Sequence, residues 1–168
     1  MTTEEKIAII DRYHSNPEQI LNILVDIQFQ SEAGYIDQQT AQLVAEKLDI
    51  SETRVYEIVS FYAILKETPQ ARYVLKICDS SPCHFSGEPV VSQWLQEKLG
   101  VGENQMTQDG LFMYHGIPCV GACAQTPFVK IKGEVFPHLT PEKLEKLLAD
   151  LKAGYYPELV GGESHVEA

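Results

Sequence analysis

The sequence has no apolar run long enough to cross a bilayer and no surplus of positive charge. Its 168 residues include 13 Lys and Arg against 24 Asp and Glu, which gives a net charge of −11. A spanning helix needs about 20 apolar residues, and phosphate backbones and anionic lipids are bound by clustered Lys and Arg. The sequence therefore predicts no direct membrane insertion and no nucleic-acid partner. The polar, acidic residues 1–5 resemble neither a secretory signal nor a transit peptide, so we expect a cytoplasmic protein, free or at the cytoplasmic face of a membrane complex.

Motifs for nucleotide or substrate chemistry are also missing. There is no P-loop, no G-x-G-x-x-G motif, no Ser/His/Asp arrangement and no carboxylate pair placed for hydrolysis. The hydrophobic content of 44% is nevertheless sufficient for a packed core. We therefore expect a folded chain that carries no catalytic residues and no site of its own for an organic substrate.

The first part of the chain has the apolar spacing of short helices. Each predicted helix follows a residue that can accept a hydrogen bond from the first helical turn. These candidate N-caps are Thr2, Asn16, Asp37 and Ser51. The sequence therefore predicts an N-terminal helical bundle over residues 1–68. Residues 1–70 also hold most of the acidity, with a net charge of −7.

Beyond residue 69 the pattern predicts strands as well as helices. The predicted order is a strand over 72–77, a helix over 89–99, a strand over 111–117, a hairpin over 128–136 and a helix that Thr140 caps. This order indicates a small α/β domain with a mixed sheet over residues 69–154, so the fold class is α+β. Residues 155–168 are predicted to be a flexible C-terminal tail.

The four cysteines form two tight pairs. Cys78 and Cys83 are spaced C-x4-C, and Cys119 and Cys123 are spaced C-x3-C. Each pair directly follows a predicted strand. If those strands are parallel neighbours, both loops open at the same edge of the sheet. In a reducing compartment, four cysteines are more often ligands or redox groups than structural disulfides.

Sites with four thiolates suit iron–sulfur clusters or zinc. Zinc sites usually contain a C-x2-C pair, which is absent here, whereas a two-iron cluster accommodates longer loops. The small residues Ser80, Ser81, Gly121 and Ala122 allow backbone N–H groups to approach the sulfur atoms. Spacing alone thus favours a [2Fe–2S] cluster and leaves zinc, thiol–disulfide chemistry and unligated core cysteines as alternatives. His84 is an alternative ligand of the Rieske type.

Several aromatic residues of the helical part have two explanations. A surface that docks a partner and burial in the chain's own core would both account for them, and both remain open at this stage. These residues are Phe29, Tyr35, Phe61 and Tyr62.

The residues around the cysteines resemble those of a known family. The chain is similar to the thioredoxin-like [2Fe–2S] subunit of the NADH-oxidising module of respiratory complex I. Related subunits serve NAD(P)-linked and electron-bifurcating hydrogenases, transhydrogenases and formate dehydrogenases. The resemblance covers about residues 20–150. It rests on residues 34–36, 54–57 and 60–62, on 78–84 with Gly87, on 119–123 with Pro127, and on 138–142.

The resemblance implies a thioredoxin-like fold for the second domain and a [2Fe–2S] cluster held by Cys78, Cys83, Cys119 and Cys123. It also implies a larger partner subunit that holds FMN, binds NAD(P) and carries further iron–sulfur centres, beside a further iron–sulfur or hydrogenase-type subunit. In such a complex this chain exchanges single electrons and performs no hydride chemistry.

Overall fold

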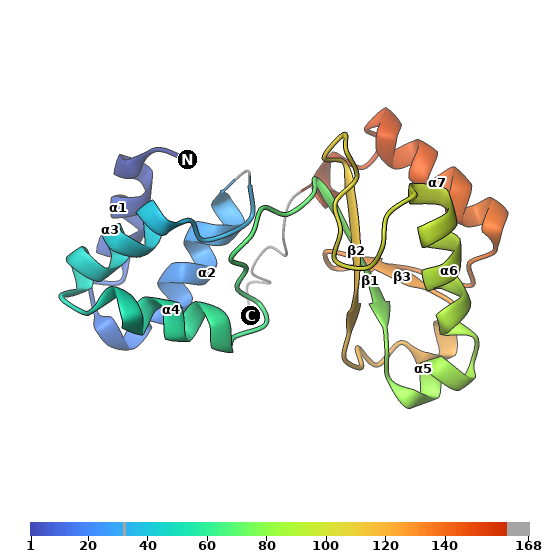
Figure 1. The fold of residues 1–168 in the computed structure, drawn as a ribbon, viewed down its shortest axis with the longest axis horizontal. Helices are drawn as coiled ribbons and strands as arrows, with labels where there is room; N and C mark the ends of the chain where they lie inside the picture. Colours follow the sequence, from blue (N-terminus) through green and yellow to red (C-terminus); the bar gives the residue numbers. More distant parts are fainter. Residues whose placement is uncertain (32, 161–168) are drawn as a thin grey trace. The chain divides into compact units, whose positions relative to one another are not determined.

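The computed structural model describes residues 1–31 and 33–160. The chain forms two compact units, and the boundary between them in the sequence lies between Gln70 and Ala71. The first unit is helical (Figure 1). Its helices are α1 (Thr3–Arg12), α2 (Ile20–Gln30), α3 (Gln38–Leu48) and α4 (Glu52–Phe61), and a short turn η1 (Pro17–Gln19) precedes α2. None of the helices in the described residues of either unit is long and apolar enough to cross a membrane.

The helix starts follow the capping residues of the sequence. Thr2 and Glu5 form a capping box in which the Thr2 N–H donates to the Glu5 carboxylate at 2.7 Å. Asp37 and Ser51 accept from the first turns of α3 and α4, as predicted. Asn16 differs slightly, because it caps the turn η1 and α2 begins only at Ile20.

One buried polar side chain fixes the end of this unit. Gln28 is 2% exposed and lies in α2 among apolar neighbours. Its amide Nε2 donates to the Ile64 carbonyl at 2.9 Å, and its Oε1 accepts from the Lys66 N–H at 2.7 Å. A buried amide with both ends satisfied is stable, so Gln28 holds the segment that follows α4 in one position.

The second unit is built on a four-stranded sheet with strand order β2-β1-β3-β4. The strands are β1 (Tyr73–Cys78), β2 (Phe112–Ile117), β3 (Val129–Ile131) and β4 (Glu134–Phe136). β1 is parallel to β2 and antiparallel to β3, so the sheet is mixed, as the sequence predicts.

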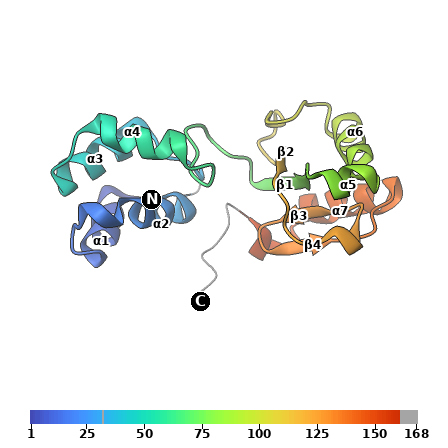
Figure 2. The ribbon, with the colours of Figure 1, turned by 90° about the horizontal axis from the view of Figure 1, so that it is seen from below.

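Two helices cover one face of this sheet. α6 (Glu88–Leu99) connects the parallel strands, and α7 (Pro141–Ala153) follows the hairpin. Figures 1 and 2 show both helices on the same side of the strands. Their apolar residues pack on the side chains of β1 and β2, and Lys98 of α6 pairs with Glu145 of α7 at 2.9 Å. The core of this unit therefore lies between the sheet and the helix pair.

The chain after α7 differs from the predicted flexible tail as far as the structure describes it. Residues 157–159 form a short turn, and Leu159 is 2% exposed in the core of the second unit. The Tyr156 ring packs edge-on against Phe136 at 5.8 Å, and Lys132 Nζ donates to the Glu158 carbonyl at 2.9 Å. The sequence prediction followed the glycines and missed these apolar anchors. Residues 161–168 of the predicted tail lie outside the described residues.

Replacement of Leu159 by alanine is therefore expected to destabilise the protein by about 2–5 kcal/mol, because it opens a cavity in a packed core. The exposed Tyr155 (73%) offers the matched control, and Tyr155→Ala should change stability by less than about 0.5 kcal/mol. Urea denaturation midpoints measure both effects. Equal midpoints for the two variants would show that residues 155–160 do not belong to the folded core.

Candidate metal centre

The sheet brings the two cysteine pairs to one edge. Cys78 is the last residue of β1, and it lies opposite Ile117, the last residue of the parallel strand β2. Cys119 follows two residues later. The chain thus leaves both strands at their carboxyl ends, and the prediction that the two loops open on the same edge is confirmed.

The first cysteine pair contains a short helix that the sequence analysis treated as a loop. This helix, α5, covers Ser81–Phe85, and Ser80 is its N-cap residue. The His84 N–H donates to the Ser80 carbonyl at 2.9 Å. Pro82 stands in the first turn, where its missing N–H costs nothing. Serine with proline in the next turn could have predicted the start of this helix. Cys83 is the buried residue of α5.

The Cys83 sulfur contacts one further cysteine of each pair. The Sγ atoms of Cys83 and Cys123 lie 4.0 Å apart, and the Cys83 thiol donates a hydrogen bond to Cys78. Two thiolates bound at 2.3 Å to one tetrahedral metal lie about 3.8 Å apart. The Cys83–Cys123 separation therefore suits a shared metal ion. Among the described residues, no three Cys, His, Asp or Glu side chains already surround one point.

Backbone and side-chain donors point at the sulfur atoms. The Gly121 N–H lies 3.4 Å from Cys119 Sγ. Cys78 accepts from the Ser80 N–H, from the Ser80 hydroxyl and from the Val120 N–H. The expectation that small loop residues let N–H groups approach sulfur is met at Ser80 and Gly121. Such donors stabilise negative charge on sulfur and help set a cluster's potential.

Burial divides the thiols into an inner and an outer pair. Cys78 and Cys83 are buried, while Cys119 and Cys123 are exposed. Burial raises the pKa of Cys83 to about 12, and the hydrogen bond to Cys78 adds to this effect. Burial also acts on Cys78, but the hydrogen bonds from Ser80, Cys83 and Val120 outweigh it and lower its pKa. Cys83 therefore holds a proton that a metal would displace on binding.

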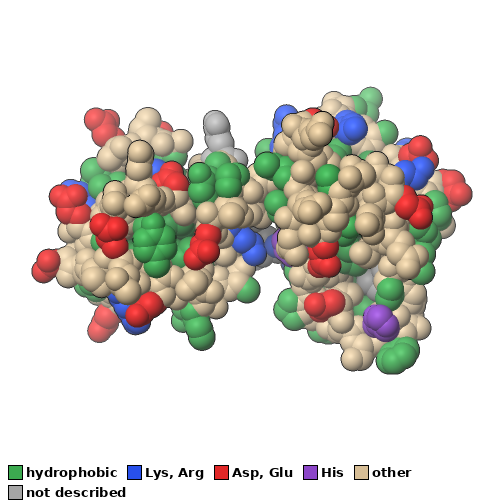
Figure 3. All heavy atoms as spheres, in the orientation of Figure 1, with side chains coloured by type: hydrophobic (Ala, Val, Ile, Leu, Met, Phe, Trp, Pro, Cys, Tyr) green, Lys and Arg blue, Asp and Glu red, His purple; other side chains and the backbone are tan. Residues whose placement is uncertain are grey.

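The loops around the sulfur atoms carry no formal charge. Residues 80–87 and 116–129, which we call the uncharged loops, contain no Lys, Arg, Asp or Glu. Phe85 is 88% exposed and Val120 is 37% exposed. Figure 3 shows histidine and hydrophobic side chains at this end of the second unit. The two loop segments therefore carry no charge of their own in a chain with a net charge of −11, and the acidic side chains of Asp79 and Glu103 line a cavity beside them.

His84, the alternative Rieske-type ligand, lies at the surface. Its side chain is exposed and meets Phe85 edge-on, with the ring centroids 5.7 Å apart. It also lines a cavity of about 170 Å³ with Cys78, Asp79 and Glu103. The four cysteines therefore form the candidate donor set without His84.

Thr126 is a candidate site residue that the sequence analysis missed. Its hydroxyl lies 3.8 Å from Cys83 Sγ and 2.8 Å from the Cys123 carbonyl, so one proton is shared between two acceptors. In the sequence, the signal for Thr126 was its position three residues after Cys123. The contact spans 43 residues of sequence, and only the folded chain reveals it.

We expect Thr126→Val to lower the reduction potential of a bound cluster, because the reduced form loses a hydrogen bond to sulfur. The volume of the side chain is conserved, so the cluster should remain bound. A redox titration followed by EPR measures the shift. Thr53→Val, at an exposed position of α4, should leave the potential unchanged. Equal potentials in both variants would remove Thr126 from the site.

The mixed sheet places two cysteine pairs at one edge, which is the arrangement that a metal centre ligated by cysteine would need. The chain belongs to the thioredoxin-like [2Fe–2S] ferredoxin family, which matches residues 7–152. Proteins of this family carry a [2Fe–2S] cluster. The donor set fits this cofactor, because it offers four thiols and N–H donors to sulfur at one edge.

Two relatives are similar to this chain over most of their length. An NADH-quinone oxidoreductase subunit of Rickettsia bellii (strain RML369-C) is 30% identical over 129 residues, which is 77% of each chain. The NADP-reducing hydrogenase subunit HndA of Solidesulfovibrio fructosivorans is 31% identical and aligns over 72% of this chain and 71% of its own.

The fold also occurs in solved structures. The NAD+-reducing [NiFe]-hydrogenase in its H2-reduced state superposes with a TM-score of 0.69 at 21% identity, over 80% of this chain. The air-oxidized state gives a TM-score of 0.66 at 22% identity. This chain spans less than a quarter of that hydrogenase chain, 22% and 23% respectively. The α+β fold with a helical unit and a thioredoxin-like unit is thereby confirmed.

Proposed function

We propose that this chain is the electron-transfer subunit of an NAD(P)H-dependent oxidoreductase complex. A [2Fe–2S] cluster is held by Cys78, Cys83, Cys119 and Cys123, and the chain performs no chemistry on a substrate. The observation that supports this ligand set best is the meeting of both cysteine pairs at one edge of the sheet. The family membership supplies the identity of the cofactor.

The partner in this proposal is a flavoprotein subunit that holds FMN and binds NAD(H) or NADP(H). A flavin accepts two electrons as hydride, and a [2Fe–2S] cluster exchanges them one at a time. A further iron–sulfur or hydrogenase-type subunit completes the complex. The names of the relatives, an NADH-quinone oxidoreductase subunit and an NADP-reducing hydrogenase subunit, support such partners. We place the complex in the cytoplasm or at the cytoplasmic face of a membrane.

Anaerobic purification of the full chain tests the cofactor. We expect a red-brown protein with two iron atoms and two sulfides per chain, as the cluster formula requires. Its visible absorbance should bleach with dithionite, and the reduced protein should give a rhombic EPR signal. The domain limits are tested in the same way: a fragment of residues 69–160, which keeps Leu159 in the core, should carry the signal. A colourless protein with stoichiometric zinc would instead identify a zinc-stabilised interaction module.

A further inference from the structure

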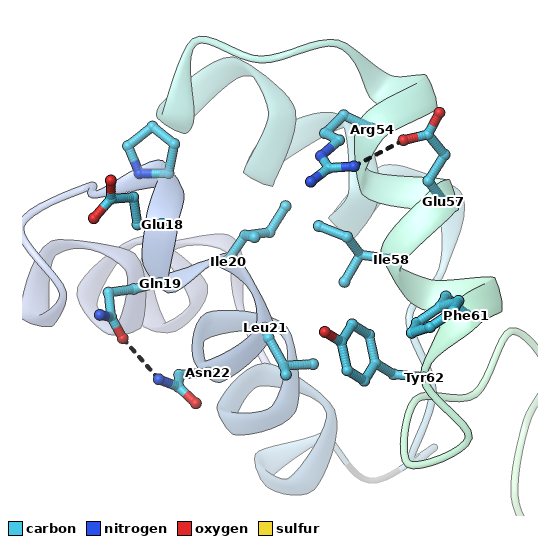
Figure 4. A pocket seen from close by; sticks show the side chains of 11 residues that line it. Glu18, Gln19, Ile20, Leu21, Asn22, Arg54, Glu57, Ile58, Phe61 and Tyr62 are labelled. Carbon is cyan, nitrogen blue, oxygen red and sulfur yellow. Dashed lines mark hydrogen bonds and ion pairs between the residues drawn. The ribbon is translucent and has the colours of Figure 1, made fainter.

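The helical unit carries a groove that the cysteine site does not use. It lies between residues 17–22 and the second half of α4 and has a volume of about 640 Å³ (Figure 4). Ile20 and Ile58 are buried beneath it, while Phe61 and Tyr62 stand at one end. In Figure 4 the Tyr62 ring points toward Leu21 across the groove. The apolar wall of the groove is contributed by α2 and α4, and polar side chains of residues 18, 19, 22, 54 and 57 line the rest.

The apolar wall continues onto the surface beside the groove. Phe61 is 79% exposed, Ile64 is 43% exposed and Tyr62 is 39% exposed. The Phe61 and Tyr62 rings meet edge-on with their centroids 5.0 Å apart. Exposed aromatic side chains that lie side by side are typical of interaction surfaces. Of the two explanations left open by the sequence, exposure favours docking at Phe61, whereas Phe29 is partly buried and packs against the core of the helical unit.

The backbone that carries these side chains is already fixed. The two hydrogen bonds of buried Gln28 hold Ile64 and Lys66, and the Leu65 N–H donates to the Tyr62 carbonyl at 2.9 Å. A surface that is ordered before binding loses less conformational entropy when a partner docks.

Charge at the rim of the groove selects the kind of partner. Arg54 is paired with Glu57 at 3.0 Å, so these two charges offset each other. The carboxylate of Glu18 has no cation within ion-pair distance among residues 1–31 and 33–160. The rim therefore carries one uncompensated negative charge, on a unit whose net charge over residues 1–70 is −7. A second copy of this chain would bring a further −11, of which −7 lies in its residues 1–70, and is disfavoured by repulsion.

We propose that this groove binds a basic amphipathic helix of a partner subunit. A helix fits because the groove is formed by helices, so an added helix extends the bundle and its apolar residues at i, i+3 and i+4 face Ile20, Ile58 and Phe61. A Lys or Arg on the rim of that helix pairs with Glu18. This inference rests on the proposed function, since it places a subunit of the oxidoreductase complex in the groove.

Photo-crosslinking in the intact complex identifies the occupant. The complex is purified from the native host through a tag on this chain, with p-benzoylphenylalanine in place of Phe61 or, as the control, in place of Tyr155. We expect the probe at position 61 to cross-link to a partner segment that has Lys or Arg along one face of a helix. Cross-links to a second copy of this chain, to an acidic segment or to nothing in an intact complex would overturn the proposal.

Affinity measurements test the apolar contact at Phe61 and the charged contact at Glu18 separately. Phe61→Ala should weaken association with the purified partner subunits roughly tenfold or more, as loss of a central aromatic anchor does. Glu18→Gln should weaken it less and reduce its dependence on salt. The controls Tyr155→Ala and Glu4→Gln change similarly exposed groups and should leave association unchanged. Unchanged affinity in Phe61→Ala and Glu18→Gln would refute the docking site.

The EPR signal of the isolated chain separates the two proposals. Both groove variants should retain the [2Fe–2S] signal of the unmodified chain, because neither residue touches a cysteine. If the signal is present and both variants bind partners normally, the groove assignment fails and the electron-transfer function stands. If the unmodified chain has no cluster, the proposed function fails, and the helix assignment loses its basis with it.

Discussion

Replacement of Cys119 by serine is expected to abolish or strongly alter the [2Fe–2S] EPR signal. Serine offers a harder, more basic oxygen, which is a poorer ligand for iron in a sulfide-rich centre. Cys119 is exposed, and its sulfur accepts from the Gly121 N–H two residues further along the same loop. The fold should therefore survive the change. Iron content and the EPR spectrum of the dithionite-reduced protein measure the effect.

His84→Ala is the matched control for this variant. His84 neighbours Cys83 in sequence, but its ring lies on the surface against Phe85. We expect the g-values and the iron content of the His84→Ala variant to equal those of the unmodified protein. Full retention of the normal spectrum in Cys119→Ser would exclude Cys119 as a ligand, and a changed spectrum in His84→Ala would reopen the Rieske-type alternative.

Phe128→Ala should have the largest effect on stability near the site. Phe128 is 0% exposed and packs with Cys78, Cys83 and Ala122, so one side chain supports both cysteine loops. Removing a buried phenylalanine costs about 3–5 kcal/mol. We expect a lower denaturation midpoint and faster loss of the cluster absorbance, because the loops that hold the cysteines lose their common support.

A core variant in the helical unit shows whether this coupling is local. Leu24 is fully buried in the first unit, and Leu24→Ala should cost about 2–5 kcal/mol there. Under conditions in which both variants are folded, cluster loss should accelerate only in Phe128→Ala. The same acceleration in Leu24→Ala would show that general destabilisation, rather than support of the loops, controls retention of the cluster.

Local chemistry explains why most of the fold could be predicted. A capping side chain and the helix that follows it are close in sequence, so Thr2, Asp37, Ser51 and Thr140 marked helix starts correctly. The five-residue helix α5 escaped prediction because it is too short to show a period. Leu159 escaped because the few apolar residues between Gly154 and Gly161 are too short a run to show a period or to reveal what they pack on.

The candidate site was predictable to the level of residue type and no further. The cysteine pairs that follow two strands indicated that the sulfur atoms lie at one edge of the sheet. The 4.0 Å Cys83–Cys123 contact and the Thr126 hydroxyl join positions 40 and 43 residues apart, respectively, and depend on the register of the sheet. Likewise, aromatic residues in the helical part fitted both a core and a surface, and only their exposure separated the two.

The uncharged loops have a consequence for how electrons reach the cysteine edge. Freely diffusing redox partners find each other quickly when opposite charges guide the collision, and their rates fall as salt rises. Residues 80–87 and 116–129 offer no such guidance, and depletion of charge is typical of the core of a lasting interface. Electron transfer at this edge should therefore occur within a stable complex. Its rate should depend neither on ionic strength nor on the concentration of a free carrier.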